Sequence, residues 1–122
     1  MTTQQVANKL WKYCQEGKWA QAQKELYASN VWSQEPWGSS PRIVQGSKGV
    51  QQKGEWWAKN VKVFDMKVSK PTVAGSWITM KMAMETQNKA KGSPRIQSEE
   101  ICLYNVKDGK IVSEQFFYDA GQ

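Results

Sequence analysis

The sequence predicts one α+β domain over residues 1–122, in which three N-terminal helices pack on a strongly curved, mixed but mostly antiparallel sheet and enclose a pocket. Three observations indicate this fold class. The first half of the chain has helical apolar periodicity, the second half alternates apolar and polar residues as strands do, and Asp108-Gly109 joins the last two strands. A chain of 122 residues has the length of one domain and can bury a core as well as one cavity.

Three segments have the apolar spacing of amphipathic helices. The first helix is expected to begin at a cap on Thr2 or Thr3 and to stop at Gly17. The second is expected to run from Trp19 until Ser29-Asn30 ends it, and the third to start at Gly46-Ser47. The residues expected to face inward are Val6, Leu10, Trp11 and Cys14 in the first, Trp19, Ala22, Leu26 and Tyr27 in the second, and Val50, Gly54 and Trp57 in the third.

Strand-like segments fill most of the remaining chain. A short strand is expected over Val31–Glu35, and Pro36 ends it because proline cannot donate to a ladder. The segments Val61–Lys70 and Thr72–Lys89 follow the third helix, with Pro71 between them. One face of the latter carries flexible apolar side chains that suit core filling or an irregular cavity, namely Ile78, Met80, Met82 and Met84.

The two C-terminal strands place acidic side chains among apolar ones. Asp-Gly favours a two-residue hairpin turn, since Gly adopts positive φ without strain. Because side chains alternate between the two faces of a strand, one face carries Glu100, Cys102, Tyr104 and Val106 in the first strand, and Val112, Glu114, Phe116 and Tyr118 in the second. A buried carboxylate needs a partner or a shifted pKa, so this face suits a lined pocket better than a plain core.

Composition excludes several classes of function. No apolar run approaches the roughly 18 residues of a membrane span and the N-terminus lacks a signal-peptide pattern, so a cytoplasmic protein without a membrane partner is expected. The chain contains no His, which excludes zinc hydrolases and Ser-His nucleophile pairs, and no metal or other cofactor is predicted. Its two cysteines, Cys14 and Cys102, are expected to be buried free thiols.

The net charge of +6 does not by itself indicate nucleic-acid binding. Lysines are spread through every segment at positions that the periodicity leaves outside, and only Arg42 and Arg95 could recognise a phosphate with two hydrogen bonds. The seven Trp fall on apolar faces or in loops and are not interleaved with clustered Lys. We therefore expect a dispersed solvated surface and no nucleic-acid partner.

Four features together match one known fold. They are the first helix followed by Gly17, Glu35-Pro36 after the first strand, the Gly46-Ser47 start of the third helix, and the segments 106–111 and 114–119. With them the chain resembles the NTF2-like superfamily, in particular its SnoaL-like and ketosteroid-isomerase-like members, which implies a cone-shaped fold over nearly the whole chain. The fold hosts isomerases, cyclases, dehydratases and binding proteins alike. Seven Trp beside many Gln, Lys and Ser would also suit an engineered family member.

The resemblance implies a role for Glu35. Ketosteroid isomerases place a general-base carboxylate just before a Pro at the end of the first strand, and Glu35 matches this position. Their hydrogen-bond donors to the enolate correspond here to Leu10 and Cys102, neither of which donates strongly, with Tyr13 and Tyr104 as the available substitutes. Because one such donor is worth about 2.7 to 4 kcal/mol of barrier, the loss argues against efficient steroid isomerisation.

Although the chain lacks these donors, its sequence still predicts an acidic and aromatic pocket. Glu35, Glu100 and Glu114 are predicted to converge on it as candidate catalytic groups, since crowded carboxylates at low dielectric cannot all ionise. The alternative for Glu100 and Glu114 is pairing with Lys or Arg at the rim, or contact with a dimer partner. The predicted wall and ligand-binding residues are Leu10, Tyr13, Cys14, Trp37, Trp57, Phe64, Met80, Met82, Cys102, Tyr104, Phe116 and Tyr118.

Three functions fit this site. The first is a homodimeric pocket protein that binds an apolar or aromatic small molecule through Trp and Met walls and a carboxylate anchor. The second is a proton-transfer enzyme of isomerase, cyclase or lyase type with Glu35 as general base, assisted by Glu114 or Glu100, and the third is a dimeric protein-interaction domain. The dimer face is expected on the convex side of the sheet, which carries Trp77, Thr79, Ile101, Leu103 and Phe117.

Overall fold

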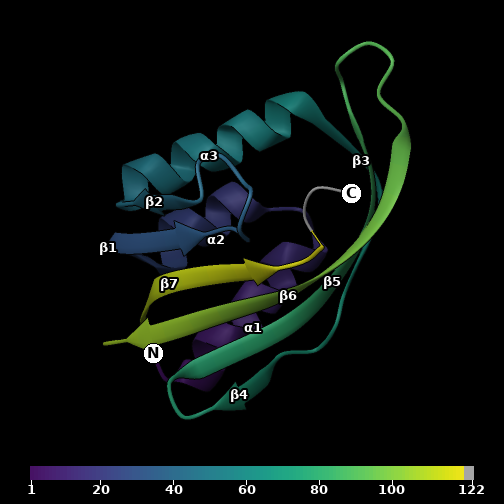
Figure 1. Ribbon diagram of the computed structural model, residues 1–122. Helices are drawn as coiled ribbons and strands as arrows, with labels where there is room; N and C mark the ends of the chain where they lie inside the picture. The colour runs from purple at the N-terminus through teal and green to yellow at the C-terminus, as the bar shows by residue number, and fades with distance from the viewer. Residues whose placement is uncertain (120–122) are drawn as a thin grey trace.

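Three helices lie on one face of a single seven-stranded sheet (Figure 1). The computed structural model describes residues 1–119. The helices are α1 (Thr3–Gln15), α2 (Trp19–Leu26) and α3 (Ser47–Asn60), and the strands are β1 (Tyr27–Gln34), β2 (Ile43–Gln45), β3 (Val61–Val68), β4 (Thr72–Ala74), β5 (Trp77–Asn88), β6 (Arg95–Lys107) and β7 (Lys110–Phe117). The predicted α+β architecture is confirmed.

The sheet is mixed, with one parallel pair. Its strand order is β2-β1-β7-β6-β5-β3, and β4 pairs with β5 beside this path. Strands β1 and β7 run parallel, while the remaining pairs are antiparallel. In Figure 1 the long β5–β6 hairpin curves up past the end of α3, so the sheet is strongly bent as the sequence predicted. Within residues 1–119 no helix is long and apolar enough to cross a membrane.

A capping box and a glycine set the two ends of α1. Thr2 Oγ1 accepts a hydrogen bond from Gln5 N at 3.1 Å, and Gln5 Oε1 accepts one from Thr2 N at 2.9 Å. Just beyond the helix Gly17 takes a φ of +70°, a conformation that favours glycine after a helix end. Both ends of this helix agree with the sequence prediction.

The boundary between α2 and β1 differs from the prediction. The helix ends at Leu26 and the strand begins at the next residue, so Ser29-Asn30 lies inside β1 rather than at a helix end. The parallel ladder with β7, which pairs Tyr27 with Ile111, extends the strand toward its N-terminus. Tertiary pairing therefore overrides the local turn signal of Ser-Asn.

The predicted long strand over Thr72–Lys89 is divided in two. A turn at Gly75, with a φ of +59°, separates β4 from β5 and folds them into a hairpin. Strand β2 was not predicted, because its three residues are too few to show an alternating pattern. It pairs with the end of β1 and frames the loop that follows Glu35.

The Asp108-Gly109 turn is confirmed, with φ of 51° and 75° at its two residues. The register of β7 differs in one respect from strict alternation. An irregularity between Asn105 and Val106 makes Val106 pair with Ile111, which is fully buried, while Glu114 still pairs with Tyr104. Ile111 therefore lies on the core face, whereas alternation alone had placed it on the opposite face from Glu114.

The core fills the space between the helices and the sheet. Both cysteines lie in it as buried free thiols, as predicted. Its buried members are Val6, Ala7, Leu10, Cys14, Ala22, Leu26, Val31, Val50, Val68, Ile78, Met80, Met82, Cys102, Tyr104, Val106 and Ile111. The inward face predicted for β5 is confirmed at its buried positions, since Ile78, Met80 and Met82 belong to this cluster and Met84 packs against it.

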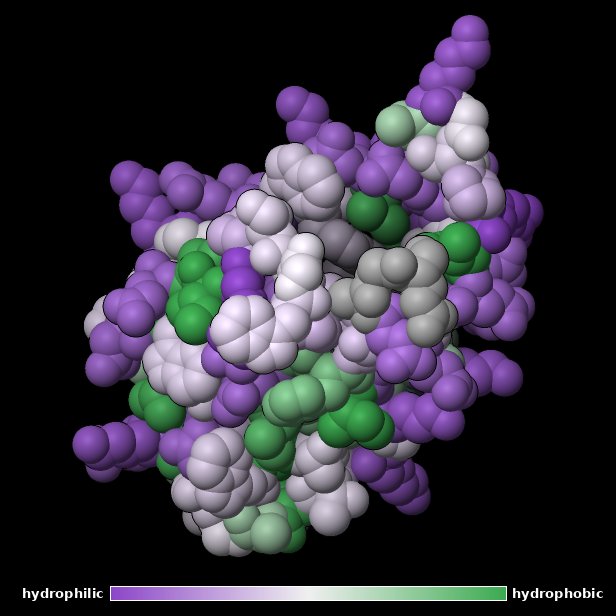
Figure 2. All heavy atoms as spheres, in the orientation of Figure 1, coloured by the Kyte–Doolittle hydropathy of each residue, from purple (hydrophilic) through white to green (hydrophobic). Residues whose placement is uncertain are grey.

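The outer face of the sheet carries an exposed apolar patch. Trp77, Ile101 and Phe117 remain 43%, 47% and 48% exposed, and Thr79 pairs with Leu103 between them. Figure 2 shows green side chains gathered over the lower middle of this face, with purple hydrophilic ones around them. We refer to Trp77, Thr79, Ile101, Leu103 and Phe117 as the outer patch.

Replacing Gly109 tests the turn that fixes the β6–β7 register. Gly109→Ala places a side chain at a φ of 75° and brings its Cβ to 2.9 Å from Met1 N, so we expect a loss of at least about 1–2 kcal/mol in the free energy of unfolding, measured with urea. Gly109→Asn is the matched control, because Asn tolerates the left-handed region better than Ala. An equal loss in both variants would contradict the assigned role of backbone conformation.

Candidate functional site

A buried carboxylate joins β1 to β7 on the helix-facing side of the sheet. Glu114 is only 5% exposed and accepts hydrogen bonds from the Tyr27 hydroxyl and, at 2.6 Å, from Ser33 Oγ. Ser33 is also the residue opposite Glu114 in the parallel β1–β7 ladder. The two hydroxyls thus supply the donors that a desolvated carboxylate needs.

Lys53 connects a second carboxylate to this group. Its Nζ lies 3.0 Å from Glu35 Oε1 and donates a hydrogen bond to Ser33 Oγ at 2.8 Å. The same ammonium lies 5.3 Å from the centroid of the Phe116 ring. Together with Glu100, the linked side chains form what we call the carboxylate cluster, namely Tyr27, Ser33, Glu35, Lys53, Glu100 and Glu114.

The local sequence explains how Glu35 and Lys53 come to face each other. Glu35 directly follows β1, and its backbone N donates a hydrogen bond to Arg42 O at 2.8 Å, which holds the end of the strand against the returning chain. Lys53 lies three residues after Val50, the buried residue of α3. Since residues three apart share a helix face, the Lys53 side chain points toward the sheet.

Glu100 is the third carboxylate of the cluster. On β6 it shares a face with Cys102, whose Sγ donates a weak hydrogen bond to Glu100 Oε1 at 3.5 Å. Burial raises the pKa of Glu100 to about 7; the Cys102 contact opposes this rise, and the charges of Glu35 and Glu114 add to it. The carboxyl therefore changes protonation state near neutral pH, which is what a general acid or base requires.

Burial also raises the pKa of Glu114, while its hydrogen bonds from Ser33 and Tyr27 and the Lys53 charge act in the lowering direction. Burial, followed by the charge of Glu114, raises the pKa of the Tyr27 hydroxyl well above its ordinary value. Tyr27 therefore keeps its proton and remains a donor. This end of the cluster is a satisfied hydrogen-bond network.

Glu35 differs from Glu114 because one of its oxygens is unsatisfied. Its Oε1 pairs with Lys53, but its Oε2 is buried and finds no donor among residues 1–119. The Tyr118 hydroxyl is a candidate donor beside it: burial, then the Glu35 charge and a hydrogen-bonding contact with Glu35 raise its pKa to about 12, although no Tyr118–Glu35 hydrogen bond of normal geometry is formed within residues 1–119. A buried acceptor without a partner costs free energy, and such atoms point to a ligand or a proton that occupies them.

The structure brings part of the predicted site together. Glu35, Glu100 and Glu114 interact electrostatically, and Phe116 and Tyr118 lie beside them. Six other predicted wall residues are at most 5% exposed and belong to the packed core beneath the cluster, namely Leu10, Cys14, Met80, Met82, Cys102 and Tyr104.

Two predicted wall residues on the helices lie elsewhere. The Tyr13 hydroxyl donates a hydrogen bond to Glu25, between α1 and α2. Trp57 packs edge-on against Trp19 at a centroid distance of 5.4 Å, between α2 and α3. Helix–helix packing therefore uses both rings, which the apolar stripe alone could not distinguish from a pocket wall.

Trp37 and Phe64 also lie outside the predicted wall. Trp37 is 81% exposed in the loop after β1 and stacks 3.9 Å from the Arg42 guanidinium. Phe64 falls at an irregularity between Val63 and Asp65 in the β3–β5 ladder, and its ring stacks 3.6 Å from the guanidinium of Arg95. The local break in alternation removes Phe64 from the face that its position in the sequence predicted.

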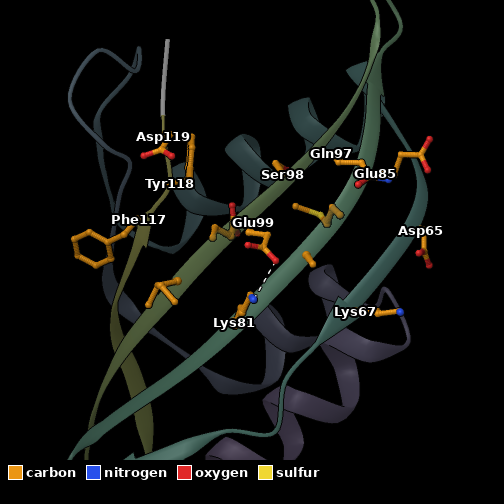
Figure 3. A pocket seen from close by; sticks show the side chains of 14 residues that line it. Asp65, Lys67, Lys81, Glu85, Gln97, Ser98, Glu99, Phe117, Tyr118 and Asp119 are labelled. Atoms are coloured by element: carbon orange, nitrogen blue, oxygen red, sulfur yellow. Dashed lines mark ion pairs between the residues drawn. The ribbon is translucent and has the colours of Figure 1, made fainter. Parts of the chain in front are cut away.

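An open hollow of about 930 Å³ is lined by residues of β3, β5 and β6 from both faces of the sheet and by the end of the chain after β7 (Figure 3). Figure 3 shows Lys81 reaching toward Glu99, and these groups pair at 3.0 Å. Of the predicted site residues, Glu100 and Tyr118 border the hollow, and Phe117 of the outer patch stands at one end. Its mixed charged lining resembles a contact surface more than an apolar ligand site.

Sequence reasoning missed three members of the cluster, Tyr27, Ser33 and Lys53. Lys53 stands three residues after Val50 and four before Trp57, so the helical period could have placed it on the inner face. Ser33 shares a strand face with Glu35 by simple alternation. Tyr27 was expected to face inward, but from the end of a helix, so its place on β1 and its hydrogen bond to Glu114 were not predicted. Within residues 1–119 no group of three or more His, Cys, Asp or Glu is arranged to hold a metal ion.

Comparisons with known proteins agree on the fold. The profile of the SnoaL-like domain matches residues 1–118, whereas no curated protein matches. A solved structure of a candidate SnoaL-like polyketide cyclase from Mesorhizobium loti is 30% identical over 97% of this chain and 100% of that one, with a TM-score of 0.92. A candidate isomerase from Bacillus subtilis is 17% identical over 98% and 90%, with a TM-score of 0.74.

A third structure, of a ketosteroid isomerase-like fold from Catenulispora acidiphila in complex with trimethylamine, is 14% identical. It covers 81% of this chain and 73% of that one, with a TM-score of 0.67. At this identity the likeness concerns the fold alone. The resemblance inferred from the sequence is confirmed by these matches.

The raised pKa of Glu100 predicts that the free energy of unfolding depends on pH. Its proton stabilises the folded state fully below its unfolded pKa of 4.5, and this contribution is lost as the pH rises through about 7. Over that range we expect Glu100 to lower the free energy of unfolding by about 3 kcal/mol. Glu100→Gln should therefore unfold at higher urea than the wild type at pH 8 and not at pH 4, with Glu99→Gln on the outer face as control. Parallel pH curves for wild type and Glu100→Gln would contradict this.

Proposed function

This chain belongs to the SnoaL-like domain family, and we propose that its carboxylate cluster anchors a small apolar or aromatic molecule. The observation that carries the proposal is the buried Glu35 Oε2, which has no donor among residues 1–119. A ligand hydroxyl, amine or acidic C–H placed there would satisfy it. Binding would thus remove the free-energy penalty of a buried acceptor without a donor.

Apolar side chains around the cluster support an aromatic or apolar ligand body. Phe116 lies 5.3 Å from the Lys53 ammonium, and the partly buried Met84 and Tyr118 border the hollow together with Glu100. Ring faces and flexible thioethers adapt to flat ligands of irregular outline. The deeper core residues, including Met80 and Cys102, would form the closed floor of this site.

A second candidate function is proton transfer with Glu35 as general base. Glu35 offers an unpartnered oxygen, and Glu100 beside it has a pKa of about 7, so one carboxyl can accept a proton while the other supplies one. The Mesorhizobium loti relative is described as a candidate polyketide cyclase, which favours a ligand that carries carbonyl groups. This function would be of isomerase, cyclase or lyase type and uses no metal.

We also propose that the outer patch is covered by a second copy of the chain. Its three large side chains are 43% to 48% exposed and lie on adjacent strands, with charged residues of both signs around the neighbouring hollow. Such a surface suits a symmetric interface with an apolar centre and a polar rim. A different protein on this patch, as in an interaction domain, is the competing occupant.

Sedimentation tests the assembly. At tens of micromolar, where an interface of standard size holds, we expect a dimer for the wild type and a monomer for Phe117→Lys, because a charge would be buried at the centre of the patch. The control is Trp56→Lys, which changes an aromatic residue on α3 that is 60% exposed. This variant should remain dimeric. A monomeric wild type would contradict the proposal.

Binding and proton transfer can be separated with 2-tetralone, an aromatic ketone with acidic α-protons. We expect it to shift the NMR signals of the Met82 and Met84 methyl groups in carbon-13 methyl-labelled protein, in the wild type and in Glu35→Gln. If the chain is an enzyme, the wild type also speeds exchange of the α-protons with D₂O and Glu35→Gln does not, since an amide cannot accept the proton.

If 2-tetralone binds but its α-protons do not exchange faster with D₂O, the result supports a ligand-binding protein and not a proton-transfer enzyme. Exchange that persists in Glu35→Gln would remove Glu35 from the role of base. An absence of methyl shifts with 2-tetralone and with other flat aromatic probes would contradict a ligand site at the cluster.

A further inference from the structure

The positions that correspond to the enolate donors of ketosteroid isomerases cannot act in this chain. Leu10 is 1% exposed and Cys102 is fully buried, and both belong to the apolar core. Cys102 Sγ is already turned toward Glu100. A base at Glu35 would therefore need a different group to stabilise negative charge that develops on a ligand oxygen.

Lys53 is placed to be that group. Its Nζ lies 3.0 Å from Glu35 Oε1, 2.8 Å from Ser33 Oγ and 5.3 Å from the Phe116 ring centroid, and its side chain is 22% exposed. An ammonium has three N–H donors, and these two oxygens take two of them. The third N–H finds no partner among residues 1–119, on the side of the sheet where Glu35 Oε2 is also unpartnered.

Ser33 and Glu114 hold Lys53 in this position. Ser33 Oγ accepts from Lys53 and donates to Glu114 Oε2 at 2.6 Å, and Tyr27 donates to the other Glu114 oxygen. The ammonium is therefore fixed from the β1 side while Glu35 contacts it from the end of that strand. A base and a cationic donor thus stand next to each other in a half-buried setting, where charge interactions are strong.

We propose that Lys53 is the electrophilic donor of this site. It selects ligands whose oxygen becomes negatively charged when a proton is lost, such as a phenol or an enolisable aromatic ketone. The inference rests on the proposed function, because it requires that a ligand binds at the carboxylate cluster. It adds the chemical class of the ligand and a catalytic residue that the resemblance to ketosteroid isomerases does not supply.

The proton-transfer step balances with these residues alone. The C–H bond next to a ketone breaks, its proton goes to Glu35 Oε2, and the bonding pair forms a C=C bond while the carbonyl π pair moves to the oxygen. The enolate oxygen then accepts a hydrogen bond from Lys53. A phenol gives up its O–H proton to Glu35 in the same way, and the phenolate faces Lys53.

Charge balance favours this arrangement. Before the step Lys53 compensates the Glu35 carboxylate, and after it Lys53 compensates the ligand oxyanion while Glu35 is neutral. The net charge of the site does not change, so no uncompensated ion forms in the partly buried setting. A ligand whose oxygen cannot become negatively charged would offer the third N–H of Lys53 only a neutral acceptor, which makes a weaker hydrogen bond.

The experiment compares 2-naphthol with 2-methoxynaphthalene, which has the same ring but no acidic proton. We expect the wild type to bind 2-naphthol about tenfold or more tightly than the ether, as a charge-assisted hydrogen bond allows. Absorbance should show that bound 2-naphthol ionises at a lower pH than free 2-naphthol. The exchange rate of 2-tetralone α-protons in D₂O is the second readout.

Lys53→Met should lower the affinity for 2-naphthol about tenfold, leave that for the ether unchanged, and return the ionisation of bound 2-naphthol toward that of the free molecule. It should lower kcat for 2-tetralone exchange more than it raises KM, and Lys53→Arg should restore part of both effects. Lys81→Met is the matched control, since Lys81 forms a 3.0 Å pair with Glu99 on the outer face. If Lys53→Met does not fold, Lys53→Arg and the wild-type comparison still decide.

Equal binding of 2-naphthol and its ether by the wild type, with no shift in ionisation, overturns the role of Lys53 while a ligand site at the cluster stands. Equal effects of Lys53→Met on both probes also overturn it, because they indicate a merely structural ion pair. If neither probe binds and no methionine methyl shifts, the proposed ligand site fails and the role of Lys53 fails with it.

Discussion

The buried carboxylate of Glu114 imposes the constraint on which this structure depends. An ionisable group that is 5% exposed must receive hydrogen bonds, and both come from β1, through Tyr27 and Ser33. The parallel β1–β7 pair is what brings these donors to it. That requirement accounts for a strand that starts directly after α2, and it ties the first third of the chain to the last strand.

The same constraint positions the rest of the cluster. Ser33 uses its second hydrogen-bonding capacity on Lys53, so α3 lies over β1 with that lysine pointing inward, and Lys53 in turn meets Glu35. Other parts of the cluster work against stability, since Glu100 has a raised pKa and Glu35 Oε2 lacks a donor among residues 1–119. Unfavourable features gathered at one place, while the surrounding core is well packed, are typical of a functional site.

Prediction from the sequence was most successful where one local rule decides the outcome. The Asp108-Gly109 turn, the α1 cap at Thr2 and the alternation along β6 were all expected, and alternation with the Glu35-Pro36 break also indicated the three carboxylates. Prediction failed where the register of strand pairing shifts, in the β3–β5 and β6–β7 ladders. Ile111 turned into the core and Phe64 toward Arg95, because ladder irregularities interrupt alternation and leave no mark in the sequence.

The sequence alone therefore determined the fold class, the order of the elements and the acidic character of one sheet face, since these follow from periodicity, turn chemistry and residue type. Only the tertiary structure decided which polar groups meet. Ser33 and Glu114 are far apart in the chain, as are Lys53 and Phe116, and no local pattern links them. Their contacts depend on the parallel β1–β7 pair and on how α3 packs across it, and such long-range packing is set by the whole core rather than by any one segment.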